Sequence, residues 1–327
     1  VFTVTLINMT PEAPKGIPND TTLLFQAQVR ALASLSGNLP GIRPRRTASG
    51  LDDDDGTNEL IYRNVREFAV GHGIAAEWDG AADLAVEKVE TAWLPRGRVR
   101  GTTSEGHALL KAIREQKGSV LEASRLSEQG DHKAICSELK AFCGVYEAWI
   151  AESLKARLTE FHAPRRVTAE TIVSRCEMAL TRMKSGVGCL ESNANAWKAF
   201  CLANRAMDRQ SRFPAKGDRA GPLKWRPFQL AFLLLSVRSI AAPDDPDRMT
   251  MDLLWFPTGG GKTEAYLAMT AYQIFLRRLE TANRRDSGGV DVLMRYTLRL
   301  LTIQQFQRAA SLIAACEFLR REDEPAL

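Results

Sequence analysis

The sequence lacks cysteine pairs at the two-residue spacing that most structural zinc sites use. Its six cysteines stand singly along the chain: Cys136, Cys143, Cys176, Cys189, Cys201 and Cys316. Cys136 and Cys143 are seven residues apart, which places them on one face of a helix, and His132 lies four residues before Cys136. A zinc site on these three side chains stays open as an alternative, but the pattern favours reduced thiols in a cytoplasmic protein.

Long apolar runs are also missing. The run Leu230–Leu235 has six residues, whereas a helix needs about 20 apolar residues to cross a bilayer. No stretch resembles a secretory signal peptide, so we expect a cytoplasmic chain with no membrane contact. The composition is otherwise that of a globular protein, with 45% hydrophobic and 25% charged residues, and 327 residues suffice for two or three domains.

The first of three predicted domains covers residues 1–100. Short runs of β-forming residues occur in Val1–Ile7, at Trp78 and over 85–94, and a helical pattern extends over 58–70. We therefore expect a mixed α/β or β-rich N-terminal domain.

The second predicted domain, residues 101–212, is helical. Apolar residues recur there at spacings of three to five, as in Ile135, Leu139, Phe142, Tyr146, Trp149, Leu154 and Leu158. A further long helix is expected over Ala169–Met207, with a break near Gly186–Gly188. A polar stretch over 208–223 contains prolines and glycines and marks the boundary of a third domain, residues 213–327.

The most informative stretch of the third domain is Phe256–Thr263, which reads Phe-Pro-Thr-Gly-Gly-Gly-Lys-Thr. The apolar run Met249–Trp255 before it predicts a buried strand, and the apolar spacing after it predicts a helix. A strand, a glycine turn and a helix together direct backbone N–H groups and a positive helix end at one point. We expect a triphosphate there, with Lys262 on the β- and γ-phosphates and the Thr263 hydroxyl on Mg²⁺.

One position departs from the general phosphate-loop pattern, because Phe256 stands where that pattern has glycine. The stretch instead resembles the first ATP-binding motif of superfamily 2 helicases. The resemblance implies ATP and Mg²⁺ as cofactors and Lys262 and Thr263 as catalytic residues. The full predicted cofactor-binding set is Arg226, Gln229, Thr258, Gly259, Gly260, Gly261, Lys262, Thr263 and Glu264.

A segment upstream of the glycines supports this interpretation. Lys224–Gln229 opens a predicted helix, with Pro227 at an early helical position. The Gln229 amide donates and accepts at once, which suits the Hoogsteen edge of adenine. Superfamily 2 helicases carry a similar Arg-Pro-x-Gln motif, and here Gln229 lies 33 residues before Lys262.

A downstream segment predicts nucleic-acid contacts. The run Val290–Thr297 predicts a second buried strand, and the residues after it open a helix. Arg299 and Gln304, in the pattern Arg-x-Leu-x-x-Gln, resemble a helicase motif that holds the nucleic-acid backbone. Thr297 and Leu298 stand where that motif has Pro and Thr. Residues 211–327 carry 17 Lys and Arg against 13 Asp and Glu, a net charge of +4 that suits a phosphate-rich partner.

The resemblance extends to one group of these helicases. Residues 256–266 and 294–309, with Phe68–Gly73 and the opening run followed by Leu24–Gln26, are similar to the DrmA helicases of the DISARM anti-phage systems. This resemblance implies an ATP-dependent helicase or translocase that acts on DNA, single-stranded or with a single-stranded overhang. It also implies a DrmB-like partner subunit.

An acidic motif of the Asp-Glu-x-His type, which such motors use to hold Mg²⁺ and orient water, is missing from the sequence. The expected fold class is therefore α/β: a mixed N-terminal domain, a helical middle region and the first part of a RecA-like parallel-sheet domain. We expect this stretch alone to bind nucleotide without hydrolysing it. Two alternatives stay open, an ATP-gated nucleic-acid-binding scaffold without unwinding activity and a signalling ATPase unrelated to nucleic acid.

Overall fold

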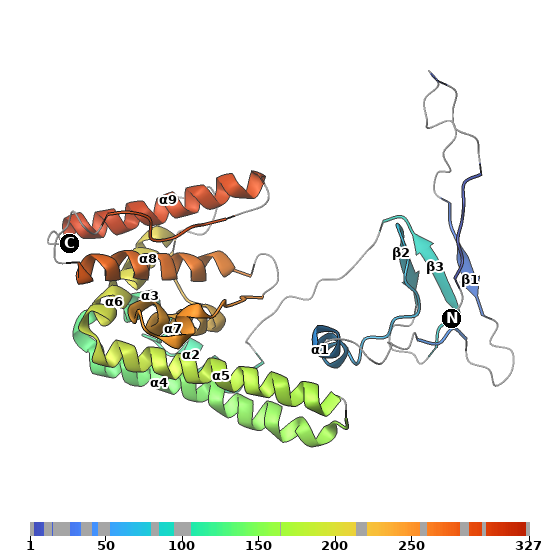
Figure 1. Ribbon diagram of the computed structural model, residues 1–327, viewed down its shortest axis with the longest axis horizontal. Coiled ribbons are helices and arrows are strands. Elements are labelled where there is room, and N and C mark those ends of the chain that lie inside the picture. The colour runs from blue at the N-terminus through green and yellow to red at the C-terminus, as the bar shows by residue number, and fades with distance from the viewer. Residues whose placement is uncertain are drawn as a thin grey trace. The chain divides into compact units, whose positions relative to one another are not determined.

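The computed structural model describes residues 3–9, 15, 27–33, 41–44, 53–79, 85–94, 106–163, 165–213, 221–255, 260–281, 288–295 and 299–324. The chain divides into two compact units (Figure 1). The first comprises Val1–Arg100 and Phe161–Ala169, and the second comprises Gly101–Glu160 and Glu170–Leu327.

The first unit contains a small antiparallel sheet and one helix. Its elements are β1 (Arg30–Leu32), α1 (Asp53–Ile61), β2 (Ala75–Trp78) and β3 (Lys88–Ala92). The strand order is β1-β3-β2, with Arg30 opposite Glu90 and Trp78 opposite Val89. Phe68 packs edge-on against Trp78 at 5.7 Å between ring centroids, and Val86 and Val89 complete a small core.

The predicted strands at Trp78 and within 85–94 are confirmed. The strand over Val1–Ile7 is wrong for the part that the structure describes, because Thr3–Ile7 has no strand pairing and its side chains are exposed. The helix over 58–70 is also wrong beyond Ile61, where the chain becomes irregular. Both errors arise because local β or helix propensity needs packing partners to persist.

The second unit is helical, as predicted for its middle region. Its described α-helices are α2 (Ala108–Glu115), α3 (Ala123–Leu126), α4 (His132–Trp149), α5 (Arg165–Ser192, of which the residues from Glu170 on belong to this unit), α6 (Ala194–Ser211), α7 (Pro227–Ala241), α8 (Lys262–Glu280) and α9 (Arg299–Glu322). Its described residues also form the shorter helical turns η2 (Gln129–Asp131), η3 (Ile150–Leu154), η4 (Lys155–Glu160) and η5 (Pro246–Met249). Of the helices in the described ranges, none combines the length and the apolar character that a membrane crossing requires.

Helices α4 and α5 lie side by side and antiparallel (Figure 1). Two ion pairs connect them, Lys140–Glu191 at 2.5 Å and Glu147–Lys184 at 2.7 Å, and a third, Lys155–Glu177 at 2.5 Å, joins η4 to α5. The predicted break near Gly186–Gly188 is wrong, since α5 continues to Ser192. The chain breaks instead at Asn193, whose side-chain oxygen accepts the Ala196 N–H at 3.0 Å and caps α6.

One core is shared by helices on both sides of the polar stretch 208–223. Helix α6 packs against α8 and α9, and α7 packs against α8. Phe200 from α6 and Tyr272 and Phe275 from α8 are completely or almost completely buried in this core. The predicted boundary at 212/213 therefore lies inside the second unit.

The two strands predicted around the glycine-rich stretch are not formed among the described residues. Residues 250–255 and 290–295 run without strand pairing, and Met251, Leu253 and Trp255 are 94%, 86% and 75% exposed. An apolar run becomes a strand only when a neighbouring strand pairs with it, and the described part of the chain supplies none here. The observed fold is thus mainly helical with a small antiparallel sheet, and the expected parallel sheet is not found in it.

Gly186 allows α5 and α7 to approach closely. A Cβ atom built on Gly186 would lie 1.9 Å from the backbone oxygen of Leu234 in α7, a separation that no real side chain tolerates. Gly188, one half-turn further along α5, would meet no atom within 4 Å. A side chain at Gly186 would therefore clash with α7, whereas a side chain at Gly188 would not.

We expect Gly186→Ala to lower the free energy of unfolding by about 1–3 kcal/mol, because the backbones of α5 and α7 must move apart. Gly188→Ala is the matched control. It should be neutral or stabilising by up to about 1 kcal/mol, because alanine favours the helix and meets nothing. Urea unfolding measures both. Equal effects of the two substitutions would contradict the close helix contact.

Candidate nucleotide site at the glycine bend

The start of α7 forms one side of the candidate site. Pro227 occupies the first helical turn, where its missing N–H is not needed, and Arg226 precedes it with extended backbone. The Gln229 side-chain oxygen accepts the Arg226 backbone N–H at 2.8 Å. This bond closes the first turn of α7 and fixes the side chain of Gln229, which is 4% exposed.

The segment before α7 is anchored to the helical core. The Ala123 N–H donates to the Leu223 oxygen at 3.0 Å, and the Trp225 N–H donates to the Leu121 oxygen at 2.7 Å. The buried Trp225 indole donates to Asn204 of α6 at 2.8 Å. The residues directly before Arg226 are therefore held by the core, and this fixes the position at which α7 begins.

The glycine bend, residues Gly260 and Gly261, forms the opposite side of the site. Gly261 has φ of 87° and ψ of 28°, a left-handed conformation that glycine adopts without strain, and α8 begins at the next residue. A Cβ atom at Gly261 would lie 2.7 Å from the Gln229 side-chain nitrogen. Both the backbone angle and the close approach of Gln229 therefore require glycine here.

Two side chains of α7 hold the carbonyl groups of this bend. Arg226 Nη1 donates to the Gly260 oxygen at 2.8 Å, and Gln229 Nε2 donates to the Gly261 oxygen at 2.7 Å. In a trans peptide the C=O and the following N–H point in opposite directions. The N–H groups of Gly261 and Lys262 therefore point away from Arg226 and Gln229. Two successive amides at a helix N-terminus, turned to the same side, suit an anion.

Glu264, in the first turn of α8, connects this helix to α9. One of its carboxylate oxygens, Oε1, bonds and pairs with the guanidinium of Arg308. The other oxygen, Oε2, is buried and has no hydrogen-bond partner among the described residues. That oxygen would lie 3.3 Å from a Cβ atom at Gly261, so it faces the bend. A carboxylate in the first turn also complements the positive end of α8.

The structure brings together five of the predicted cofactor-binding residues: Arg226, Gln229, Gly260, Gly261 and Glu264. Lys262 and Thr263 are the first two residues of α8 and are half-buried. Thr258 and Gly259 lie outside the described residues. On α9, Gln304 is exposed, whereas the side chain of Arg299, the first residue of that helix, lies outside the described part.

Gln229 makes contacts that the sequence did not indicate. Its amide oxygen and nitrogen are both bound to backbone, at Arg226 and at Gly261. The amide nitrogen of Gln229 carries a second N–H, and its oxygen carries a second lone pair, so each can form one more hydrogen bond. Adenine contact by Gln229 stays a prediction, while its contact with the bend is observed.

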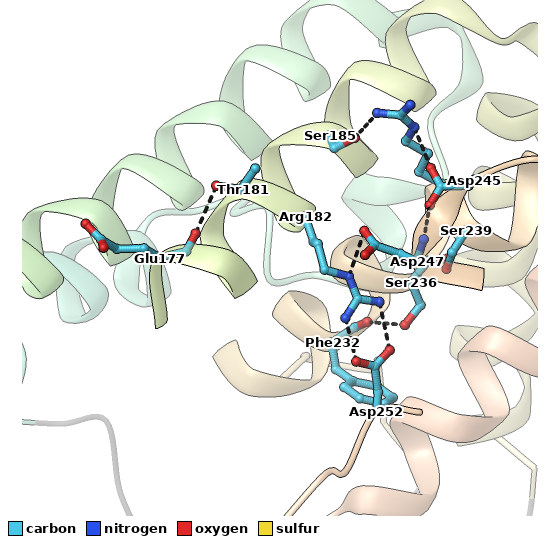
Figure 2. Close-up of polar contacts among 11 residues, drawn as sticks. Glu177, Thr181, Arg182, Ser185, Phe232, Ser236, Ser239, Asp245, Asp247 and Asp252 are labelled. Atoms are coloured by element: carbon cyan, nitrogen blue, oxygen red, sulfur yellow. Dashed lines mark hydrogen bonds and ion pairs between the residues drawn. The ribbon is translucent and has the colours of Figure 1, made fainter. Parts of the chain in front are cut away.

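Asp252, four residues before the glycine-rich stretch begins, was not anticipated from the sequence. Both of its oxygens bind the guanidinium of Arg182 on α5, at 2.5 and 2.8 Å (Figure 2). Hydrogen bonding to Asp252 raises the pKa of Arg182. The sequence feature that could have pointed to Asp252 is its position as a single carboxylate inside the apolar run Met249–Trp255. A charge in an apolar run that packs near a protein core needs a partner.

The alternative zinc site receives no support from the described residues, where no cluster of three metal-binding side chains is found. Cys136 and Cys143 are buried in the helical core, and burial raises the pKa of each thiol to about 11. Zinc binds the thiolate, which this environment disfavours. The ring nitrogen Nε2 of His132 lies 2.9 Å from the Leu190 oxygen, within hydrogen-bonding distance.

Comparison with known proteins gives one clear relationship. The DISARM protein DrmA of Bacillus paralicheniformis is 33% identical to this chain over 287 residues, which cover 83% of the chain. The chain is similar to DrmA. It spans a quarter of the length of DrmA, since the match covers 25% of that protein. No family model matches the sequence. The DrmA match confirms the resemblance inferred from the motifs.

The contact between Gln229 and the bend can be tested with an isosteric change. Gln229→Glu keeps an acceptor for Arg226 but replaces the donor that binds the Gly261 carbonyl, so we expect a loss of about 1–3 kcal/mol in unfolding free energy. Hydrogen exchange should also accelerate at Gly261–Glu264.

Gln210→Glu is the matched control, because Gln210 Nε2 makes the same kind of bond, to the Arg308 oxygen at 2.7 Å. It should also reduce stability but leave exchange at Gly261–Glu264 unchanged. If both variants accelerate exchange at the bend equally, then Gln229 does not hold the bend specifically.

Proposed function

We propose that the glycine bend binds the phosphates of a nucleoside triphosphate. The observation that carries this proposal is the pair of hydrogen bonds from Arg226 and Gln229 to the Gly260 and Gly261 carbonyls. They turn the amides of Gly261 and Lys262 to the opposite side, at the positive end of a helix of 19 residues. That geometry fits an anion.

The side chains that follow the bend fit a Mg²⁺–ATP complex. Lys262 supplies a cation for the β- and γ-phosphates, and Thr263 supplies a hydroxyl oxygen of the kind that Mg²⁺ prefers. Thr258 and Gly259 would complete the loop, and Glu264 would hold α8 against α9 through Arg308. In ATP-driven motors Mg²⁺ neutralises charge that develops on the transferred phosphoryl group.

We further propose that the protein acts as an ATP-dependent DNA helicase or translocase in anti-phage defence. Three features support this: the similarity to the DISARM protein DrmA, the helicase-like motifs around Gln229 and Gln304, and the surplus of basic residues over 211–327. Arg299 and Gln304 on α9 would contact the backbone of single-stranded DNA. A DrmB-like subunit is the proposed partner.

The ion pair between Glu264 and Arg308 is a direct link between the proposed nucleotide site and the proposed nucleic-acid contacts on α9. It joins the first turn of α8, which follows the bend, to α9, which carries Gln304. A second proposal is an ATP-gated scaffold that binds nucleic acid without separating strands. The same ion pair serves either function, and only strand separation by the full-length protein distinguishes them.

Lys262→Ala should weaken binding of a fluorescent ATP analogue in the presence of Mg²⁺ by at least roughly tenfold, because one full charge contact with phosphate is lost. Lys140→Ala, which removes an exposed lysine paired with Glu191, is the control and should bind as the wild type does. Equal affinities of wild type and Lys262→Ala would refute the proposed phosphate site.

DNA binding should weaken steeply as salt is raised, because cations on the protein displace counterions from phosphates. Arg299→Gln should reduce the slope of log affinity against log salt by roughly 0.7 for single-stranded DNA, the contribution of one phosphate contact. Fluorescence anisotropy with a labelled oligonucleotide measures both. A slope that is unchanged by Arg299→Gln would remove this residue from the DNA contact.

A further inference from the structure

The segment Met251–Trp255, which enters the glycine bend, is joined to α5 through the side chain of Asp252. Met251, Leu253 and Trp255 are largely exposed, whereas the Asp252 side chain retains 25% of its exposure. Its partner Arg182 is only 9% exposed at the side chain. The contact thus restrains a largely exposed stretch, in which Leu254 is partly buried, at Asp252.

Arg182 binds this aspartate as a fork. Nη1 lies 2.5 Å from Asp252 Oδ1 and Nη2 lies 2.8 Å from Oδ2, while Nε forms an ion pair with Asp247 at 3.2 Å (Figure 2). Two parallel charge-assisted bonds fix the direction of a carboxylate as well as its position. Gly186, one turn along α5 on the same face, lies where this helix closely approaches α7.

A second arginine, Arg238 of α7, has different partners. Arg238 Nε pairs with Asp245 at 2.8 Å, and Nη1 donates to Ser185 at 2.5 Å. The Asp245 side chain in turn accepts the Asp247 backbone N–H at 2.9 Å. These bonds stabilise the turn after α7 and do not include Asp252. Arg238 can therefore serve as a control for Arg182.

We propose that Arg182 is a positioning residue for the nucleotide site, acting through Asp252 on the segment that enters the glycine bend. The inference rests on the nucleotide binding proposed above. Arg182 holds Asp252, before the glycine-rich stretch, and Arg226 and Gln229 hold Gly260 and Gly261 at its end. Before Asp252, Thr250 N–H donates within its own turn to the Asp247 oxygen at 2.9 Å, and the Arg248 side chain donates to the Ser239 oxygen of α7 at 3.0 Å.

The paired bonds from Arg182 affect nucleotide binding mainly because they fix the orientation of the Asp252 carboxylate. The length of chain that they restrain matters less. Freeing the few residues between Arg248 and Asp252 changes the closure entropy only slightly, because that entropy varies with the logarithm of length. Losing the paired bonds releases the carboxylate and its backbone to many orientations. The apparent affinity then falls in proportion to the fraction of molecules whose loop remains in the binding conformation.

The test compares Arg182→Gln with Arg238→Gln in the purified protein, at a temperature where both are folded. Two quantities are measured: hydrogen exchange over 250–255 without nucleotide, and the affinity for a fluorescent ATP analogue with Mg²⁺. We expect faster exchange and roughly tenfold weaker binding for Arg182→Gln, and neither change for Arg238→Gln. Arg182→Lys should recover only part of the affinity, because an ammonium cannot form the fork.

A double variant shows whether the effect passes through Asp252. The double variant Arg182→Gln with Asp252→Asn should bind the ATP analogue no more weakly than Arg182→Gln alone, because both substitutions break the same contact. Additive losses, or equal affinities of the Arg182 and Arg238 variants, would overturn the positioning role. If Lys262→Ala leaves the wild-type affinity unchanged, the proposed function fails instead, and the exchange data still show whether Arg182 holds the segment.

Discussion

The nucleotide binding proposed for the second unit depends on the orientation of two peptide groups at the glycine bend. Arg226 and Gln229 attract the carbonyl oxygens of Gly260 and Gly261 toward α7, and peptide planarity turns the corresponding N–H groups the other way. Any loop with glycine can bend, but only a loop with fixed carbonyls presents its amides in a fixed direction. Pre-organised amides bind an anion without first losing conformational entropy.

The helical core explains why this orientation persists. Trp225 ties the start of α7 to α6, and Tyr272 and Phe275 bury one face of α8 among the same helices. The two sides of the site therefore belong to one packed core, although they lie on either side of an apolar run that is not paired in a sheet. On α5, Gly186 allows a close approach to α7, and Arg182, one turn earlier, binds Asp252 of that run.

The sequence predicted local features well and long-range ones poorly. The helices over the middle region, Pro227 at the start of α7 and the helix after Lys262 follow from spacing and capping, which are local. The strand at Met249–Trp255 was predicted from its apolar run and is not formed, because pairing depends on a neighbour that the run does not specify. The Arg182–Asp252 contact joins residues 70 positions apart, so no local pattern could indicate it. Gln229 was assigned to the site from its motif, but its bond to Gly261 required the fold.

The similarity to DrmA and the geometry of the bend lead to the same expectation by different routes. The most direct measurement is an NMR titration of the protein with Mg²⁺–ATP that follows the backbone amides of Gly261 and Lys262 and the side-chain amide of Gln229. The account predicts saturable shifts of both backbone amides, while the Gln229 amide remains bonded to its carbonyl. Unchanged Gly261 and Lys262 signals at saturating nucleotide would contradict it.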